Sequence, residues 1–493
     1  MSTPRRAFIM SSIEQYLAMV INVSVIATMA RILTPDEVGH AVTGIGIGAI
    51  ALSLREFVTP EFLIQKKDID RQDLSTSFTL LSGITIFVGL AVFAVSGEIS
   101  RLYGSPELVL FLLLFLLSAV AETISLPVIA VLRRNMSFGA LANMRTVALI
   151  VYAVVTITLG FLGFGFVSYA WGTLANAMVL ACMTAYAAPY PISSMCRISV
   201  AGWRNVVAFG RFKGASQAID RIYETVPQLI LGKIISMSSV GLYNRANTIC
   251  SIPDRLIMSA FYAMAFPALA AGVRDGRDIK QAYLDTLSYL SGIYWPGVLL
   301  IALTAEPIVN LVLGPQWHEA ILIVRLLAGA AVFWFAVIGI NPLLLALGQN
   351  RDAFLSSFIC RSIAAALLCT ASLHGILAMA LSQFVAMPAQ MIISLYFARR
   401  HLRFTFAELW GAIAPSMLVT SCSMAGPLAM LVANHGNADT NLPQLAATLV
   451  LAAAGWFPGL MLANHPLLVE VRLVFKTLLS LAPWLRRNSA TTG

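Results

Sequence analysis

The sequence predicts an all-α polytopic membrane protein with about 14 transmembrane helices. Three observations support this fold class: 59% of the 493 residues are hydrophobic, only 11% are charged, and the apolar residues gather in segments of membrane-spanning length. Soluble domains carry about 25% charged residues. The net charge of +9 does not require a nucleic-acid partner, and we expect none, because basic cytoplasmic loops produce the same excess.

The predicted transmembrane helices follow one another with short connections. They cover residues 8–32, 38–58, 74–96, 107–131, 139–162, 166–187, 206–235, 241–270, 284–312, 318–347, 352–373, 375–398, 408–433 and 443–463. The first follows Arg5-Arg6 and lacks a small-residue cleavage site, so we expect a retained helix and not a signal peptide.

Charge in the loops predicts the orientation of the chain. The even-numbered loops hold most of the basic residues, for example Lys66-Lys67, Arg133-Arg134 and Arg399-Arg400. By the positive-inside rule, both termini are expected in the cytoplasm. The tail from 466 to 493 is mildly amphipathic and is expected to lie on the cytoplasmic membrane surface. The six cysteines show no CxxC and no metal-ligand spacing, which predicts free thiols and no metal site.

An internal repeat appears when the chain is shifted by 202 residues. Arg31–Gly39 then lies over Lys233–Gly241, and Gln15 over Gln217. Both copies start in the cytoplasm, so the repeat predicts two parallel six-helix bundles related by an axis along the membrane normal. Such bundles suit a rocker-switch transporter with its cavity at their interface.

The predicted domains follow from this repeat. The N-terminal bundle covers residues 1–190 and the C-terminal bundle 200–400. The two helices of 408–465 fall outside the repeat, and the tail follows them.

One polar stripe runs down the span 206–235. Its members follow steps of three and four residues, which places them on one helix face. They are Lys213, Gln217, Asp220, Arg221, Glu224 and Gln228. An ionisable group at the centre of a bilayer costs roughly 3 kcal/mol on insertion scales. The stripe is therefore either the wall of a polar transport cavity or a buried ion pair that fixes helix packing.

Other intramembrane polar residues join this stripe as candidates for a cavity. The candidate cations are Arg55, Arg145, Lys213, Arg221, Arg255 and Arg361. The candidate carboxylates and amides are Glu14, Gln15, Asn22, Gln217, Asp220, Glu224, Gln228 and Asp254. Snorkelling to the headgroups is the alternative for Arg55 and Arg145.

A cavity with these cations favours an anionic substrate, because the arginine fork donates two bonds to a phosphate. The carboxylates either hold the cations apart or titrate and couple transport to H+ or Na+. The sequence contains no GxxxxGK[ST], no histidine ligand cluster and no nucleophile–base motif. We therefore expect no enzyme and no cofactor beyond such a coupling ion. Gly44, Gly46 and Gly48 lie within an apolar helix, where small residues usually serve close packing.

Three short segments resemble a known family. Ile32–Gly39, Leu63–Asp68 and Gly241–Ala246 are similar to the polysaccharide-exporting flippases of the MOP (MATE/oligosaccharidyl-lipid/polysaccharide) superfamily, in particular its Wzx-like exopolysaccharide and O-antigen flippases. Helix 7 of such proteins often reads Arg-x-x-Asp. Here Arg221-Ile-Tyr-Glu224 stands in its place, which keeps the charge and adds a methylene.

The resemblance implies two six-helix bundles around a central V-shaped cavity. It also implies that an undecaprenyl-pyrophosphate-linked oligosaccharide, of the acidic succinoglycan type, moves from the cytoplasmic to the periplasmic leaflet of a bacterial inner membrane by alternating access. Membrane lipids, a polysaccharide polymerase and a chain-length regulator are the candidate partners.

Other functions remain open at this point. A MATE-like cation–drug antiporter and a lipid II flippase use the same fold. An integral-membrane glycosyltransferase or polymerase would need a large extramembrane catalytic loop, and no predicted loop is long enough for a domain.

Overall fold

The computed structural model describes residues 4–65, 70–188, 197–255, 278–433 and 442–472, together with 269, 272–273 and 275. The side chains of residues 4–13, 65 and 212 lie outside this description. Every regular element in the described ranges is helical, which confirms the all-α class. Eleven helices there are long and apolar enough to cross a membrane.

The number of transmembrane helices stays a prediction. The spans predicted at 166–187 and 206–235 are helical, but they are more polar than the eleven. The span predicted at 241–270 includes residues outside the description. Lys66-Lys67, Cys196 and the tail from 473 onward also lie outside it.

The chain divides into two compact units, each of which is described by itself. Unit 1 comprises Met1–Asn244, Val312–Trp317 and Ser372–Ile376. Its elements are α1 (Pro4–Ile32), α2 (Pro35–Leu52), η1 (Ser53–Val58), α3 (Phe62–Gln65), α4 (Arg71–Tyr103), α5 (Glu107–Arg134), α6 (Phe138–Phe161), α7 (Val167–Tyr186), α9 (Trp203–Ile234), the first residues of α10 (Met237–Cys250), and η2 (Pro315–Trp317).

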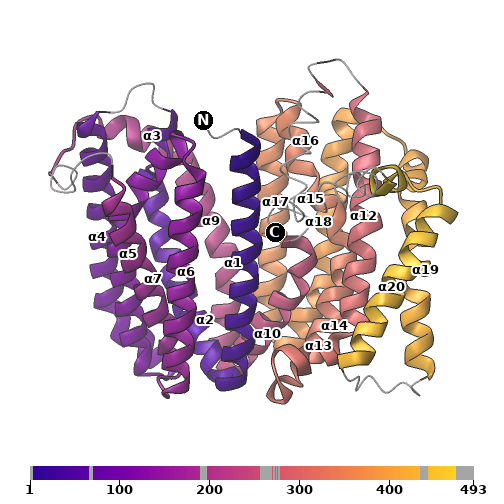
Figure 1. The fold of residues 1–493 in the computed structure, drawn as a ribbon, viewed down its shortest axis with the longest axis horizontal. Coiled ribbons are helices and arrows are strands. Elements are labelled where there is room, and N and C mark those ends of the chain that lie inside the picture. Colours follow the sequence, from indigo (N-terminus) through magenta and orange to yellow (C-terminus); the bar gives the residue numbers. More distant parts are fainter. Residues whose placement is uncertain are drawn as a thin grey trace, which may run out of the picture. The chain divides into compact units, whose positions relative to one another are not determined.

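The helices of unit 1 form one packed bundle. Helix α5 packs on α4 and α7, α7 packs on α6, and α6 packs on α1, as Figure 1 shows. A Cβ at Gly44, Gly46 or Gly48 would collide with the side chain of Phe111, Thr225 or Phe115. These three glycines therefore serve helix packing, as predicted.

The second predicted span is broken. A continuous helix over 38–58 was expected, but α2 ends at Leu52 and the chain tightens into the 3-10 helix η1. The Ser53 hydroxyl donates to the carbonyl of Ile50 at 2.6 Å, and Pro60 disfavours a helical residue before it. Backbone breaks inside membrane proteins occur where the segment lines a cavity or is buried in protein.

The start of α2 meets the start of α10 in a symmetric contact within unit 1. A Cβ at Gly39 would collide with the carbonyl of Met237, and a Cβ at Gly241 with the carbonyl of Pro35. The shift of 202 residues places Gly39 over Gly241 and Pro35 over Met237, so the two contacts are equivalent. The predicted shift thus relates the two halves of this contact, while the six-helix repeat itself stays a prediction.

The caps of these two helices follow the same shift. Thr34 and Glu37 form a capping box at α2: the Thr34 N–H donates to the Glu37 carboxylate at 2.8 Å, and the Glu37 N–H donates to the Thr34 hydroxyl at 3.3 Å. The equivalent Ser236 accepts from the Ser239 N–H at 3.1 Å at the start of α10. The Ile32–Gly39 motif is thus a helix start followed by a helix crossing.

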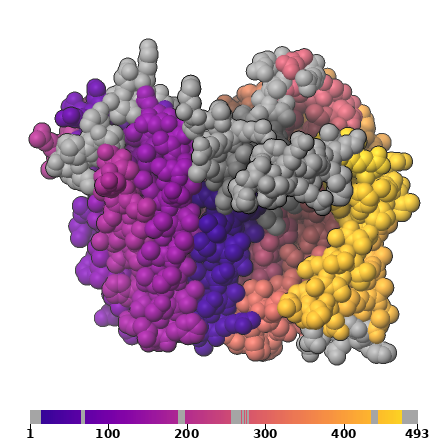
Figure 2. All heavy atoms as spheres, viewed as in Figure 1, coloured from indigo at the N-terminus to yellow at the C-terminus, as the bar shows by residue number. Residues whose placement is uncertain are grey.

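Unit 2 comprises Arg245–Leu311, His318–Ala371 and Leu377–Gly493. Its elements are the end of α10, α12 (Ile279–Leu303), α13 (Ala305–Val312), α14 (Ala320–Ala331), η3 (Val332–Trp334), α15 (Phe335–Ile338), α16 (Ile340–Ala346), α17 (Asn350–Ser372), α18 (Ile376–Leu402), α19 (Phe406–Ala433) and α20 (Leu442–Leu462). Helix α19 packs on both α20 and α12. Figure 2 shows α19 and α20 in yellow. Trp410 of α19 and Val450 of α20 are exposed, as expected of lipid-facing side chains.

A buried histidine ties the end of α20 to the rest of unit 2. His465 is 1% exposed, and its Nε2 lies 3.1 Å from the Ser288 hydroxyl of α12 and 3.0 Å from the Ser416 hydroxyl of α19. Its Nδ1 accepts from the Leu467 N–H at 3.2 Å, so the proton resides on Nε2. Burial lowers the pKa of His465, and the neutral ring is the form that fits here.

The compact units and the predicted domains divide the chain differently. By its contacts α9 belongs with unit 1, whereas the repeat assigns it to the bundle 200–400. The helices of 408–465 lie in unit 2. Contact grouping does not test the repeat, and the bundle boundaries stay predictions.

Candidate functional site

A charged cavity of about 280 Å³ lies in unit 1 beside the break in the second span. Elements η1, α3, α4, α5, α6 and α9 contribute to its wall. Its charged lining residues are Arg55, Glu56, Glu61, Glu122, Arg133, Arg145 and Lys213. We call this space the charged cavity.

Ion pairs connect the opposite charges across this cavity. The Lys213 ammonium lies 2.7 Å from the Glu61 carboxylate and 3.0 Å from that of Glu56. Arg133 also lies 3.8 Å from Glu61. Outside the lining, Glu14 lies 3.9 Å from Arg145. The cations of the cavity are thus paired with carboxylates of the same unit.

Two glycines on α9 position Lys213 in this network. A Cβ at Gly210 would collide with the carbonyl of Phe57, and a Cβ at Gly214 would lie 2.7 Å from the Phe57 ring. Small residues four apart allow a close helix approach. η1 therefore packs tightly on α9, and Glu56 comes within reach of Lys213.

Arg55 is the most enclosed cation of the cavity. It is 7% exposed, and its Nη1 lies 3.2 Å from the Glu122 carboxylate. Its Nε and Nη2 are buried, and neither has a hydrogen-bond partner in the described part of the chain. A buried donor without an acceptor costs about 1–3 kcal/mol. Snorkelling of Arg55 to the headgroups does not fit this burial.

The structure brings some predicted site residues together. Arg55, Arg145 and Lys213 line one cavity, and Glu14 pairs with Arg145 at its edge. The lining of this cavity does not include Gln15 and Asn22 of α1, which are exposed. The Asn22 amide donates to the carbonyl of Ala18 in its own helix at 2.9 Å.

The rest of the α9 stripe lies further along the helix. Arg221 is two turns beyond Lys213, about 12 Å along the axis. It pairs with Glu224 at 3.2 Å, and their side chains are 51% and 58% exposed. Gln228 donates to the carbonyl of Glu224 at 3.4 Å. The Arg221–Glu224 pair is therefore not a buried packing pair.

Two further members of the stripe, Gln217 and Asp220, are half-buried.

The remaining predicted residues belong to unit 2. Asp254 is half-buried, and its Oδ1 has no hydrogen-bond partner among the described residues. Arg255 is exposed, and Arg361 is half-buried and engaged in an interaction. Their convergence with the charged cavity of unit 1 stays a prediction.

Four charged lining residues were not predicted as site residues: Glu56, Glu61, Glu122 and Arg133. Glu122 carried a usable signal, because it lies in the middle of the apolar helix α5. Arg133 was assigned to a cytoplasmic loop, yet it reaches the cavity from the last turn of α5.

The described ranges were predicted to hold free thiols and no metal site. No group of three or more His, Cys, Asp or Glu side chains lies there in a metal-binding arrangement. The five described cysteines are free thiols, and Cys196 lies outside the description.

A family model with the description "Polysaccharide biosynthesis protein" matches residues 28–322, more than half of the chain. The chain belongs to this polysaccharide biosynthesis family. It is 24% identical over 342 residues to the succinoglycan biosynthesis transport protein ExoT of Rhizobium meliloti, covering 63% of this chain and 67% of that relative. It is 23% identical to the lipopolysaccharide biosynthesis protein WzxC of Escherichia coli, covering 61% of each chain.

A third relative is the teichuronic acid biosynthesis protein TuaB of Bacillus subtilis, 22% identical over 59% of this chain and 60% of that one. The matched regions of WzxC and TuaB thus span about three fifths of those relatives.

Solved structures show the same fold. The lipid II flippase MurJ in an inward closed conformation superimposes with a TM-score of 0.69 at 13% identity, covering 91% of this chain and 97% of that one. An inward-facing multidrug resistance MATE family transporter of the MOP superfamily gives 0.62 at 14% identity, covering 80% and 98%. The family model and the relatives confirm the predicted resemblance to Wzx-like polysaccharide exporters, and the two solved structures show the fold. The protein is a multi-pass membrane protein.

Proposed function

We propose that this protein is an inner-membrane flippase that moves undecaprenyl-pyrophosphate-linked oligosaccharide repeat units from the cytoplasmic to the periplasmic leaflet. The charged cavity beside the broken span is the observation that carries the proposal. Membership of the polysaccharide biosynthesis family, and relatives whose names include succinoglycan transport and lipopolysaccharide biosynthesis, support the substrate class.

The charged cavity suits a diphosphate that binds and leaves again. The cations Arg55, Arg133, Arg145 and Lys213 each lie near a carboxylate. A diphosphate replaces those carboxylates as the partner, and release restores the internal pairs. Such an exchange avoids leaving the buried Arg55 without a counter-charge, which would cost several kcal/mol.

Arg55 is the best-placed residue for the first contact with the diphosphate. Its two buried donors have no acceptor in the described structure, and the Nε–Nη2 edge of a guanidinium matches two phosphate oxygens. A rotation away from Glu122 exposes this edge to the cavity.

Several finer features belong to the same proposal. Transport proceeds by alternating access of two six-helix bundles around a central V-shaped cavity, with both termini cytoplasmic and no covalent chemistry. The substrate is an acidic repeat unit of the succinoglycan type, which the match to ExoT supports at 24% identity. A cavity carboxylate takes up H+ or Na+ during the cycle, and a polysaccharide polymerase and chain-length regulator receive the product.

One observation favours a second function on the same fold. Three carboxylates, Glu56, Glu61 and Glu122, also face the charged cavity, and an organic cation would pair with them. A MATE-like cation–drug antiporter is therefore the alternative. Among transporters of anionic substrates, a lipid II flippase is the alternative, and the fold match to MurJ supports it.

Deletion of the gene distinguishes these functions. The proposal predicts lower surface polysaccharide, accumulation of a lipid-linked precursor, unchanged drug susceptibility and a viable cell with a normal wall. Undiminished polysaccharide without precursor accumulation rejects it. Increased drug susceptibility would favour the antiporter, and loss of viability with peptidoglycan defects would favour the lipid II flippase.

A further inference from the structure

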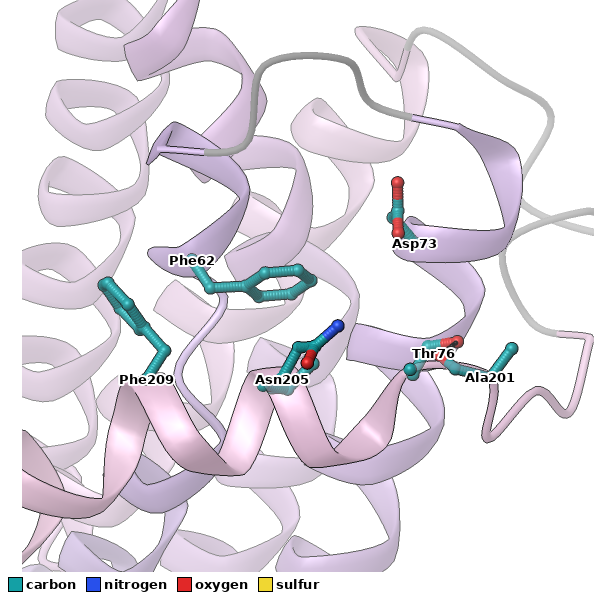
Figure 3. Close-up of a pocket in the computed structure, with 8 residues that line it drawn as sticks. Phe62, Asp73, Thr76, Ala201, Asn205 and Phe209 are labelled. Carbon is teal, nitrogen blue, oxygen red and sulfur yellow. Dashed lines mark hydrogen bonds between the residues drawn. The ribbon is translucent and has the colours of Figure 1, made fainter.

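A second cavity, of about 300 Å³, lies in unit 1. Phe62 of α3, Asp73 and Thr76 of α4, and Asn205 and Phe209 of α9 line it, as Figure 3 shows. We call it the aromatic pocket. It lies where α3, α4 and α9 meet.

Hydrogen bonds fix the wall of the aromatic pocket. The Thr76 hydroxyl donates to the carbonyl of Ala201 at 3.0 Å and lies 2.9 Å from the Ser199 hydroxyl. The Ser199 N–H donates to the Thr79 hydroxyl at 3.1 Å. The segment before α9 is thus strapped to α4, and the pocket is preformed.

Polar groups and aromatic rings share this pocket. Figure 3 shows the Asn205 amide pointing into the space between the Phe62 ring and the Asp73 carboxylate. Asn205 is exposed, so its amide is accessible to a ligand in the pocket. Asp73 accepts from the Asp70 N–H at 2.9 Å, which fixes its carboxylate at the start of α4.

This combination suits a sugar ring. The apolar C–H face of a sugar packs on an aromatic ring, while its hydroxyls both donate and accept, which amide and carboxylate groups complement. The volume lies at the lower end of small-molecule pockets, which begin at roughly 300 Å³. A purely lipidic occupant would place the Asn205 amide against hydrocarbon, at a cost of about 1–3 kcal/mol.

The aromatic pocket adjoins the charged cavity through two elements. Glu61 lines the charged cavity, and the next residue, Phe62, lines the aromatic pocket. On α9, Phe209 and Lys213 line the two cavities one turn apart, about 6 Å along the helix. A diphosphate beside Lys213 therefore places a directly attached sugar near Phe209.

We propose that the aromatic pocket is the subsite for the sugar that is attached to the diphosphate of the lipid carrier. This inference rests on the proposed function and adds a second point of recognition to it. The charged cavity then binds what all lipid-linked glycans share, and the aromatic pocket distinguishes a glycosylated carrier from the bare one.

Binding of two probes to the purified full-length protein in detergent tests the subsite. The probes are undecaprenyl pyrophosphate and the same molecule carrying one hexose. The wild type is expected to bind the hexose-bearing probe about threefold to tenfold more tightly, the equivalent of one neutral hydrogen bond. Asn205→Ala is expected to abolish this difference and to leave the affinity for the bare probe unchanged.

Asn143→Ala is the matched control, because Asn143 is exposed on α6 and lines neither cavity. It should change neither affinity. Phe209→Leu removes the stacking ring and gives a second variant should Asn205→Ala fold poorly, with the same loss of discrimination expected.

The outcomes separate the subsite from the proposed function. Equal affinity of the wild type for both probes overturns the subsite alone, as does a variant that weakens both probes equally, which would indicate a lipid-binding groove. Failure of the wild type to bind either probe overturns the proposed function and the subsite with it.

Discussion

The two partners of the Arg55–Glu122 pair should respond differently to mutation. Arg55 is 7% exposed, whereas the Glu122 side chain is 40% exposed. Glu122→Ala leaves a buried guanidinium without its carboxylate, which costs about 3 kcal/mol at the low end for broken buried pairs. Arg55→Met leaves only a hydrated carboxylate and fills the space with apolar atoms, so we expect a loss below about 1 kcal/mol.

For export the order of the two variants should be reversed. Among variants that fold, Arg55→Met should lose more export than Glu122→Ala. Arg55→Met removes the donor fork for the diphosphate, so surface polysaccharide should fall at least tenfold while thermal unfolding in detergent stays near that of the wild type. Arg55→Lys keeps the charge but loses the fork, and an intermediate level is expected.

The assay combines thermal unfolding of the purified variants with surface polysaccharide in a deletion strain at matched membrane levels. A stable Arg55→Met protein that exports normally would refute the role of Arg55 in substrate binding. A much larger loss of stability in Arg55→Met than in Glu122→Ala would refute the burial argument.

Three further predictions concern packing, pH and the α9 stripe. Gly39→Ala should lower thermal stability, because its Cβ collides with a backbone carbonyl, whereas Gly89→Ala, which meets nothing within 4 Å, should be neutral or stabilising. Equal melting temperatures of the two variants would contradict the close crossing. Burial lowers the pKa of His465, so the unfolded chain binds the proton first as the pH falls. Stability is therefore full above about pH 6.5 and declines below it, and thermal unfolding of His465→Gln should show a flatter pH profile; identical profiles would argue against this linkage. Arg221→Gln should reduce export more than Arg486→Gln in the tail, and equal export at matched membrane levels would count against a transport role for the stripe.

Local signals in the sequence predicted the helices well, because hydropathy and caps act over short distances. The capping box of Thr34 and Glu37 with Pro35 is visible in the printed sequence, and so is the helix start that it produces. The break at η1 was missed, although Ser53 and Pro60 are its physical causes. A continuous apolar run hides such a break, since hydropathy does not report backbone geometry.

The candidate site was predictable only in part. A helical stripe identified Lys213, but its partners Glu56 and Glu61 come from another element, and Glu61 lies 152 residues away in sequence. Such pairings depend on the packing of α9 on η1, which glycine positions alone do not specify. Glu122 fits the rule that intramembrane charges are functional, but it lies on α5, outside the helices that the repeat relates to the polar stripe.

Transbilayer movement of a lipid-linked oligosaccharide in proteoliposomes tests the account most directly. Purified wild-type protein is expected to transfer the glycan headgroup across the bilayer, so that an added glycosidase removes it, whereas Arg55→Met protein leaves the inner-leaflet pool protected. Equal transfer by the two proteins, or no transfer by the wild type under an imposed H+ or Na+ gradient, would contradict a cationic cavity that carries the diphosphate through the membrane.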